Sequence, residues 1–362
     1  MLTVVGLMSG TSMDGVDAAL LSTDGSAIGA FGPRLFRAYT DSERAVLRQA
    51  LDEARRLDDR AARTGVLAEA ERLVTNAHGE AVERVLAENP DVEPDLVGFH
   101  GQTVFHAAER RMTVQIGDGP LLARRLGMPV VYDFRAADVA AGGQGAPFVP
   151  LYHQALARHS DLGSNVAVVN IGGVANVTRV GEDGSLVAGD TGPGNALIDD
   201  LVRERTGEPM DRRGALAAKG RVDRGTLDRL LDNPWFALPM PKSLDRNAFS
   251  SASVRDMALE DAVATLAAFT AETIARGIAV SGGADRIVVC GGGSHNPTLL
   301  RMLAAAANCK VSTAAEIGWA GDFVEAEAFA FLAARSLAGL PLSLPTTTGV
   351  PRPMPGGVVA RP

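Results

Sequence analysis

The chain opens with two apolar runs joined by a short polar turn. Residues 2–7 are apolar, residues 9–15 form the turn, and residues 16–20 return to a strand-like pattern. Two β-type segments around a turn of glycine, serine and threonine predict a hairpin. The same design returns at residues 166–177, around Gly172 and Gly173. This repetition predicts a duplicated architecture with a ligand between its halves.

The remaining chain alternates between helical and strand periodicities. Apolar residues at helical spacing over residues 41–89 predict a helical insertion that covers a sheet. The alternation of strands and helices predicts an α/β protein. Further elements are expected at residues 96–99, 112–116, 129–133 and 286–290 as strands, at 120–126, 251–280 and 322–338 as helices, at 189–205 as a loop and helix, and after Asn296-Pro297 as a helix.

The length and the glycine-rich segments predict two lobes and a tail. A chain of 362 residues can bury large cores, and its length favours two domains. We expect residues 1–135 to form an N-terminal lobe and residues 136–345 a C-terminal lobe, with the bend at residues 141–147 as the passage between them. The tail, residues 346–362, has no core pattern of its own and is expected to pack on the surface of a lobe.

Charge and cysteine content exclude several classes of protein. The net charge is -8, and no basic run exceeds a pair, so nucleic-acid binding is not expected. Because a basic leader and an apolar stretch of about 18 residues are both missing, we expect a cytoplasmic protein without a membrane partner. Cys290 and Cys309 lie in apolar surroundings, and no disulfide is expected between them.

The first hairpin turn has the composition of a phosphate-binding loop. A backbone N–H approaches a phosphate oxygen only where no bulky side chain intervenes, and Gly10 and Ser12 provide such positions. Asp14 and Asp17 would repel a phosphate unaided, which implies a divalent cation, Mg²⁺, between them. The turn lacks a lysine and a following helix, so it is not a Walker A loop. The alternative is an ordinary hairpin turn with solubilising aspartates.

The opening segment, residues 6–17, is followed by seven further motifs in fixed order. They lie at residues 100–103, 115–118, 133–135, 142–147, 170–176, 190–195 and 289–294. Together these segments resemble the anhydro-N-acetylmuramic acid kinases of the acetate and sugar kinase/heat-shock/actin superfamily. The resemblance runs nearly end to end and implies a two-lobed, actin-like ATPase fold of the ribonuclease H-like type with an interlobe cleft.

The resemblance also implies an activity. Members of this family cleave the 1,6-anhydro bond of 1,6-anhydro-N-acetylmuramic acid with water while ATP phosphorylates the 6-oxygen. The products are N-acetylmuramic acid 6-phosphate and ADP, in peptidoglycan recycling. ATP and Mg²⁺ are the expected cofactors, and a symmetric homodimer is the expected default for such a kinase.

Asp190 is predicted to be the general base that takes a proton from the attacking water, a role that the family gives to the aspartate of its DTGPGN motif. The residues themselves predict a turn just ahead of a helix, where backbone N–H groups favour an ionised carboxylate. The alternative is that Asp190 or Asn195 merely caps the helix that begins near Ala196.

The glycine-rich turns are expected to bind the nucleotide. The first hairpin would hold the β- and γ-phosphates, with Asp14 organising the metal, and the second hairpin would close over them. The triple glycine would pass beneath the adenosine, because a side chain there would collide with it; it departs from the G-x-G-x-x-G pattern of a dinucleotide fold. The residues concerned are Gly10, Thr11, Ser12, Met13, Asp14, Gly15, Val16, Asp17, Gly172, Gly173, Gly291, Gly292 and Gly293.

Four side chains are expected to bind the sugar. Arg135 could hold the lactyl carboxylate in bidentate fashion, or form an interlobe ion pair instead. His100 and Gln102 could bond a hydroxyl or acetamido group, and Glu325 resembles a glutamate that the family places near the sugar. His100 and His106 lack a third ligand and do not predict a zinc site. The Lys242–Arg246 loop departs from the family pattern and is left out of the predicted site.

Three other functions are compatible with parts of this pattern. A kinase for another anhydro sugar, such as levoglucosan, would differ only in pocket shape. A glycosidase-like hydrolase could use Asp190 with Glu325, but would leave the two phosphate turns without a purpose. A non-catalytic, actin-like nucleotide sensor would leave the polar cluster of His100, Gln102 and Arg135 unexplained.

Overall fold

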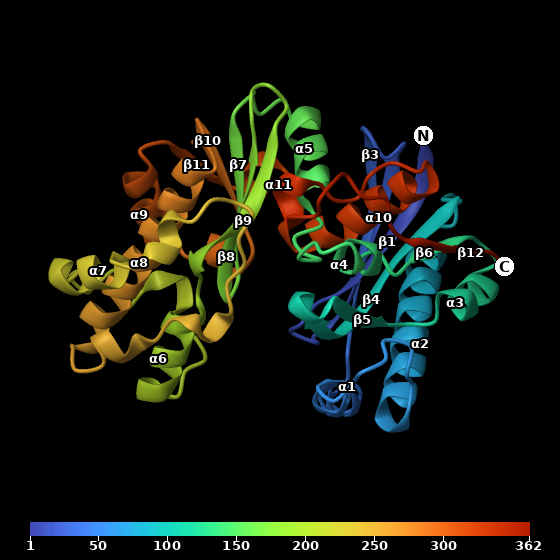
Figure 1. Cartoon of the computed structure of the whole chain (residues 1–362), viewed down its shortest axis with the longest axis horizontal. Coiled ribbons are helices and arrows are strands. Elements are labelled where there is room, and N and C mark those ends of the chain that lie inside the picture. Colours follow the sequence, from blue (N-terminus) through green and yellow to red (C-terminus); the bar gives the residue numbers. More distant parts are fainter. The chain divides into compact units, whose positions relative to one another are not determined.

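The computed structural model describes all 362 residues, which form two compact units (Figure 1). Unit 1 comprises Met1–His159 and Phe323–Pro362, and unit 2 comprises Ser160–Asp322. These boundaries differ from the predicted ones at residues 135 and 345. The reason is that helix α10 (Val324–Leu337) packs on the sheet of unit 1, which local sequence patterns do not reveal.

The sheet of unit 1 has the strand order β12-β6-β4-β1-β2-β3, and β5 pairs with β4. The first three strands form an antiparallel meander, whereas β4 and β6 run parallel to β1. The tail contributes β12 as an edge strand on β6, so it extends the sheet as well as covering a surface. The strands are β1 (Leu2–Ser9), β2 (Gly15–Thr23), β3 (Ile28–Ala38), β4 (Leu96–Ala107), β5 (Met112–Ile116), β6 (Val130–Tyr132) and β12 (Val358–Ala360).

The sheet of unit 2 repeats this plan in the order β11-β10-β7-β8-β9. Its first three strands are again an antiparallel meander, and its last two again run parallel to the first. The predicted α/β class and duplicated architecture are therefore confirmed. The strands are β7 (Val166–Ile171), β8 (Val174–Val180), β9 (Leu186–Pro193), β10 (Arg286–Cys290) and β11 (Lys310–Thr313).

Helices cover both sheets. In unit 1, α1 and α2 form the predicted helical insertion, and its apolar residues join a core with the alternate residues of β1 and β2. The other helices of unit 1 are short, apart from α10. The remaining bounds are α1 (Asp41–Ala54), α2 (Gly65–Ala87), α3 (Gly119–Leu126), α4 (Ala136–Ala140), α5 (Pro150–His159), α6 (Ala196–Thr206), α7 (Arg224–Leu231), α8 (Leu259–Val280), α9 (Pro297–Ala307) and α11 (Pro345–Thr348).

Helix α8 is the central helix of unit 2. It is long and apolar enough to match a membrane span by composition, but 72% of the matching window is buried inside the fold. It packs against α6, α7, α9 and strands β8 and β9, which accounts for its apolar character. The helix begins at Leu259, later than predicted, because Ser251–Val254 form a separate 3₁₀ turn.

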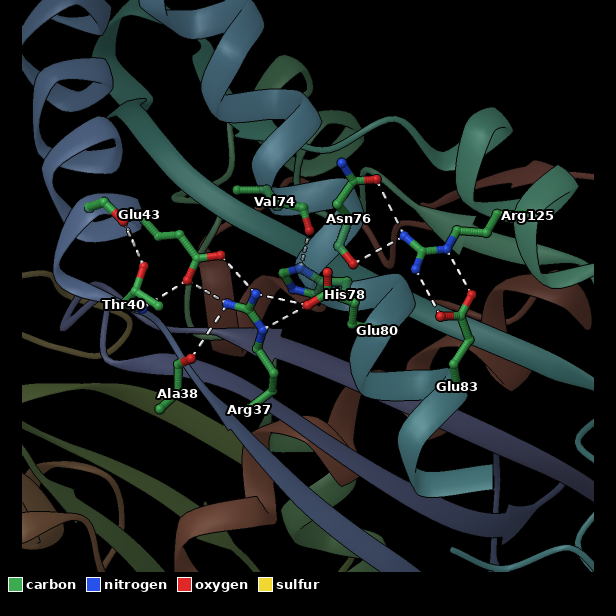
Figure 2. A network of polar contacts seen from close by, with 11 residues as sticks. Arg37, Ala38, Thr40, Glu43, Val74, Asn76, His78, Glu80, Glu83 and Arg125 are labelled. Carbon is green, nitrogen blue, oxygen red and sulfur yellow. Dashed lines mark hydrogen bonds and ion pairs between the residues drawn. The ribbon is translucent and has the colours of Figure 1, made fainter. Parts of the chain in front are cut away.

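A charged network fastens the helical insertion to the sheet (Figure 2). Arg37 on β3 donates to both carboxylate oxygens of Glu43 on α1, each at 2.7 Å, and to Glu80 on α2 at 2.8 Å. Glu43, chiefly, raises the pKa of Arg37 above its ordinary value. Glu43 also completes a capping box with Thr40 at the start of α1. One guanidinium thus joins β3 and α1 to Glu80 on α2, which lies more than 40 residues further along the chain than Arg37.

Two glycines let α10 lie directly on the sheet. Gly6 of β1 and Gly98 of β4 are register partners. A Cβ atom on Gly6 would lie 1.8 Å from the carbonyl oxygen of Ala326, and one on Gly98 would lie 2.2 Å from that of Phe329. Because successive residues of a strand face opposite sides, the residues beside Gly6 point into the core under α1 and α2. The sheet of unit 1 is therefore covered on both faces.

We expect Gly6→Ala to destabilise the fold, because its Cβ atom collides with backbone that can move only if α10 lifts from the sheet. The free energy of unfolding should fall by about 1–3 kcal/mol or more in urea titrations. Gly225→Ala on α7 is the control, since the new methyl group would lie 3.7 Å from its nearest neighbour, the Arg229 side chain. Equal stability of Gly6→Ala and the wild type would contradict the close approach of helix and sheet.

Candidate active site

A cavity of about 490 Å³ lies in unit 1 at the ends of β1, β4 and β5. It brings together six of the predicted site residues: Gly10, Thr11, Ser12, His100, Arg135 and Glu325. It also takes in side chains that the sequence did not single out as ligands. The remaining lining residues are Met8, Ser9, Thr103, His106, Gln115, Gly145 and Ala146.

The hairpin turn between β1 and β2 forms one wall of this cavity. The N–H of Met13 donates to the carbonyl oxygen of Gly10 at 3.2 Å, and Met13 takes a left-handed conformation with φ 53°. The Ser12 hydroxyl donates to the exposed carboxylate of Asp14 at 2.8 Å. A Cβ atom on Gly10 would meet nothing nearer than 3.6 Å, so a ligand can approach its backbone.

The later part of the predicted phosphate turn does not line the cavity. Met13, Asp14 and Asp17 lie outside its lining. Gly15 and Val16 are buried in β2, where Val16 belongs to the apolar core. The sequence could not separate these positions, because the apolar pattern of β2 begins inside the motif.

Gln102 was predicted to contact the sugar. In the structure, Gln102 supports the turn and does not line the cavity. Its side chain is buried, its Oε1 accepts from the Ser9 hydroxyl at 2.6 Å, and its Nε2 donates to the carbonyl oxygen of Gly10 at 3.2 Å. Both ends of the amide are therefore engaged in holding the start of the turn.

Arg135 is clamped on several sides. Its Nε donates to His100 Nε2 at 3.0 Å, and its Nη1 donates to the carbonyl oxygen of Gly145 at 2.7 Å. The rings of Phe148 and Phe329 lie 5.2 and 5.8 Å from the guanidinium carbon. A guanidinium carries five N–H donors, so three remain for an anionic ligand. Burial lowers the pKa of Arg135, but the group stays charged near neutral pH.

His100 is a neutral acceptor for Arg135. Because its Nε2 accepts a hydrogen bond, its proton resides on Nδ1, which lies 2.8 Å from the carbonyl oxygen of Gly101. Burial, and then the charge of Arg135, hold the pKa of His100 well below its usual value. The guanidinium of Arg135 therefore lies beside a neutral ring, and the carboxyl groups that interact with its charge are those of Glu325 and Asp138.

Glu325 lies at the start of α10 and lines the cavity near Arg135. Its side chain is open to solvent in the cavity, yet the protein around it raises its pKa by desolvation, and Arg135 opposes that rise. A carboxyl group is thus available near the guanidinium without forming an ion pair with it.

Asp190 lies in unit 2, within strand β9 opposite Asn176. Its N–H donates to the carbonyl oxygen of Lys242 at 2.8 Å, and its Oδ2 accepts from the N–H of Leu244 at 2.7 Å. Desolvation by burial raises its pKa to about 6, although the Leu244 hydrogen bond opposes the rise. At pH 7 about nine in ten of these carboxyls are ionised.

This environment differs from the predicted one. The sequence predicted that Asp190 sits in a turn ahead of a helix, with its charge stabilised there. The ladder with β8 extends the strand as far as Pro193, so burial dominates and the pKa moves upward. The capping alternative fails as well, since Asn195 makes no side-chain cap and its Nδ2 donates to the carbonyl oxygen of Ile171.

The Lys242–Arg246 loop, which was not among the predicted site residues, contacts Asp190. The contacts come from the backbone of Lys242 and Leu244, so the unusual side chains at Leu244 and Asp245 do not prevent them. Lys242 Nζ donates to the carbonyl oxygens of Trp235 and Phe236, which fixes the start of the loop. The motif itself was the signal that could have identified this loop.

The five glycines of unit 2 that are predicted to bind the nucleotide differ in how closely the protein packs around them. Cβ atoms on Gly291 and Gly293 would lie 2.3 Å from Asn170 Oδ1 and 2.5 Å from Ile171, so packing within the protein requires glycine there. Space remains at Gly172, Gly173 and Gly292, where the nearest atoms would lie at 3.6 or 3.7 Å. Packing within the protein therefore explains glycine at Gly291 and Gly293, whereas at Gly172, Gly173 and Gly292 the protein itself leaves room for a side chain.

Two sheets with one strand order, each opening on a hairpin with a small-residue turn, define a duplicated α/β protein. The family model described as anhydro-N-acetylmuramic acid kinase matches residues 2–361. The chain belongs to the anhydro-N-acetylmuramic acid kinase family.

Named relatives agree with this assignment over their full lengths. The anhydro-N-acetylmuramic acid kinase of Bradyrhizobium diazoefficiens is 55% identical, with 100% of both chains covered. That of Nitrobacter winogradskyi is 54% identical, again with 100% of both chains covered. A solved structure of the activator of 2-hydroxyisocaproyl-CoA dehydratase from Clostridium difficile has a TM-score of 0.42 and 12% identity, covering 93% of this chain and 96% of its own. That likeness is too distant to add to the assignment.

We expect His100 to make the fold less stable in mild acid. Its folded-state pKa is depressed, so below about pH 6.5 the unfolded chain binds a proton that the folded chain does not. Between pH 7.5 and 5.5 the wild type should lose about 1.4 kcal/mol of unfolding free energy relative to His100→Asn. Urea titrations at both pH values measure this, with the exposed His295→Asn as control. An equal loss in wild type and His100→Asn would contradict the neutral histidine.

Proposed function

We propose that this chain is an ATP-dependent kinase that opens the anhydro ring of 1,6-anhydro-N-acetylmuramic acid with water and phosphorylates O6. The products are N-acetylmuramic acid 6-phosphate and ADP, in peptidoglycan recycling. Family membership from residue 2 to residue 361 supports this function. The structural observation that carries it is Asp190: its carboxylate accepts one backbone hydrogen bond from Leu244, its own N–H donates to the carbonyl oxygen of Lys242, and burial raises its pKa to about 6.

Such a carboxylate suits general-base chemistry. A base is most effective when its pKa lies near the working pH, and its help is typically worth about 10²–10⁴-fold. Asp190 takes a proton from the water molecule while the oxygen of that water attacks the anomeric carbon. The bond from that carbon to O6 breaks, O6 takes the γ-phosphoryl group, and ADP leaves.

The cavity of unit 1 supports binding of the sugar acid. Arg135 would hold the lactyl carboxylate through its remaining donors, since two of its hydrogens already fix the guanidinium plane. His100 keeps that guanidinium in place and, being neutral, does not compete for the anion. Glu325 would accept from a sugar hydroxyl. Gln102 contributes by holding the hairpin turn.

The hairpin turns support binding of the nucleotide. The backbone amides of Gly10, Thr11 and Ser12 would hold its phosphates, and Gly172, Gly173 and Gly292 leave room for its approach. Gly291 and Gly293 would contribute by shaping the backbone. Met13, Gly15, Val16 and Asp17 complete the proposed turn as its support.

The residues present fit Mg²⁺ bound mainly through phosphates and water. No group of three or more acidic, histidine or cysteine side chains forms a ready-made cation site. Mg²⁺ usually takes only one or two carboxylates and keeps several waters. Asp14 is exposed and its carboxylate is oriented by Ser12, so it would hold the ion. When bound, the ion would neutralise charge on the phosphate oxygens.

The proposal includes the cytoplasm as the location, where ATP is available, and a homodimer as the default assembly. It involves neither nucleic acid nor a membrane, in keeping with the net charge of -8.

Asp190→Asn is expected to lower kcat by about 10²–10⁴-fold while the KM for the sugar changes little. In the wild type, kcat/KM should rise with pH up to about 6 and then level off, because only the ionised carboxylate accepts a proton. The variant should lose this dependence. It should be at least as stable as the wild type above pH 6, since it removes a charge that burial disfavours.

These measurements follow ADP release with 1,6-anhydro-N-acetylmuramic acid as substrate. In ¹⁸O-labelled water, the label should enter the anomeric hydroxyl of the product. Phosphorylated product without that label would refute the hydrolytic step. Turnover without ATP would instead indicate a simple hydrolase, and full activity of Asp190→Asn would remove Asp190 from the chemistry.

Alanine substitutions at Gly292, which has space around it, and at Gly293, which is closely packed, should have different effects. Gly292→Ala is expected to leave the melting temperature unchanged but to raise the KM for ATP by about tenfold or more, because its methyl group enters space left for the nucleotide. Gly293→Ala should lower the melting temperature, because its methyl group meets Ile171. Unchanged ATP affinity in Gly292→Ala would place the nucleotide elsewhere.

A further inference from the structure

The buried carboxylate of Asp138 in unit 1 joins the cavity wall to the C-terminal segment, residues 343–348. Asp138 on α4 is 1% exposed. Its Oδ1 accepts from the N–H of Gly145 at 2.7 Å, and its Oδ2 accepts from the hydroxyl of Thr348 at 2.6 Å. The Ser343 hydroxyl donates to the same Oδ2 through a short hydrogen bond. Three donors therefore converge on Asp138, and two of them come from residues more than 200 positions away.

The glycine-rich bend is folded around this carboxylate. The N–H of Gly143 donates to the backbone carbonyl of Asp138 at 2.9 Å, and the N–H of Gln144 donates to the backbone carbonyl of Thr348 at 2.6 Å. A Cβ atom on Gly143 would lie 2.2 Å from Asp138 Oδ1, so the bend passes as close to the carboxylate as backbone allows. The bend and the C-terminal segment thus have a common anchor.

Gly145 connects Asp138 to Arg135 through two hydrogen bonds. Its N–H is bound by Asp138, and its carbonyl oxygen accepts from Arg135 Nη1 at 2.7 Å. Gly145 and Arg135 both line the cavity. A shift of the Asp138 carboxylate would therefore move the acceptor that sets the direction of the guanidinium.

Another buried carboxylate on unit 1 shows what a purely structural role looks like. Glu327 on α10 is also 1% exposed, pairs with Arg34 at 2.7 Å and accepts from the Tyr152 hydroxyl at 2.8 Å. Neither Glu327 nor its two partners lines the cavity. Asp138 differs because its partner is the residue that holds Arg135.

We propose that Asp138, anchored by Ser343 and Thr348, is a positioning residue that aims Arg135 at the carboxylate of the substrate. This rests on the proposed function, in which that carboxylate belongs to the lactyl group. The C-terminal segment then affects substrate binding indirectly, because it holds Asp138, which in turn holds Gly145 and Arg135.

The test compares two substrates that differ in one charge: 1,6-anhydro-N-acetylmuramic acid and its lactyl amide. Asp138→Asn should raise the KM for the acid by about 10–100-fold, because a misdirected guanidinium loses its fit to a carboxylate. The kcat should stay within about threefold, and the KM for the amide should hardly change. The preference for the acid should fall by the same factor.

Matched variants keep the test independent of folding. Ser343→Ala with Thr348→Val leaves Asp138 in place and should reproduce the effect in part, and Thr348→Ser should retain wild-type preference. Thr346→Val alters an exposed hydroxyl in the same helical turn and should change neither KM nor melting temperature. Tyr152→Phe, which removes a hydrogen bond from Glu327, should lower the melting temperature and leave the preference for the acid intact.

Two results would overturn the assignment. One is an equal rise in KM for the acid and the amide, and the other is a lower melting temperature with the preference for the acid retained. Either would make Asp138 a structural anchor alone. A wild-type protein that turns over neither compound would count against the proposed function itself, so the two failures are distinguishable.

Discussion

The contact on which unit 1 depends is the one between the backbone of α10 and strands β1 and β4. Gly6 and Gly98 allow it, because no side chain separates helix from sheet at these positions. The contact places the ring of Phe329 4.5 Å from that of His100 and 5.8 Å from the guanidinium carbon of Arg135. It also brings Glu325 to the cavity. A wall of the site is thus set by a helix that lies more than 200 residues beyond those strands.

The two units differ in the charged groups that they bury at their candidate sites. In unit 1, a neutral His100 accepts a hydrogen bond from Arg135, and Glu325 lies close enough to interact with the guanidinium charge. In unit 2, burial brings the pKa of Asp190 close to neutrality while keeping most of the carboxyls ionised at pH 7. The same strand order therefore positions a cavity lined by a guanidinium in one unit and a buried carboxyl group in the other.

Local patterns predicted the hairpins, the helical insertion and the helix after Asn296-Pro297, because periodicity and capping residues act over short distances. They also pointed to His100 and Arg135, which the structure does bring together. They did not predict the environment of Asp190, because pairing with β8 and burial decide it. They identified the motif around Gly291, but only the fold reveals that Asn170 fills the space that a side chain at Gly291 would need. Nothing local marks Asp138 as different from any other helical aspartate.

The discontinuity of unit 1 has a consequence for how the protein is made. Its C-terminal part, with α10, the Ser343 and Thr348 anchors and strand β12, follows unit 2 in the chain. During translation, the N-terminal strands leave the ribosome long before the helix that covers them, and unit 2 emerges complete in between. Domains generally fold as units as they emerge. The unit translated second thus finishes folding first, and the cavity is complete only after α10 and the Ser343 and Thr348 anchors have left the ribosome.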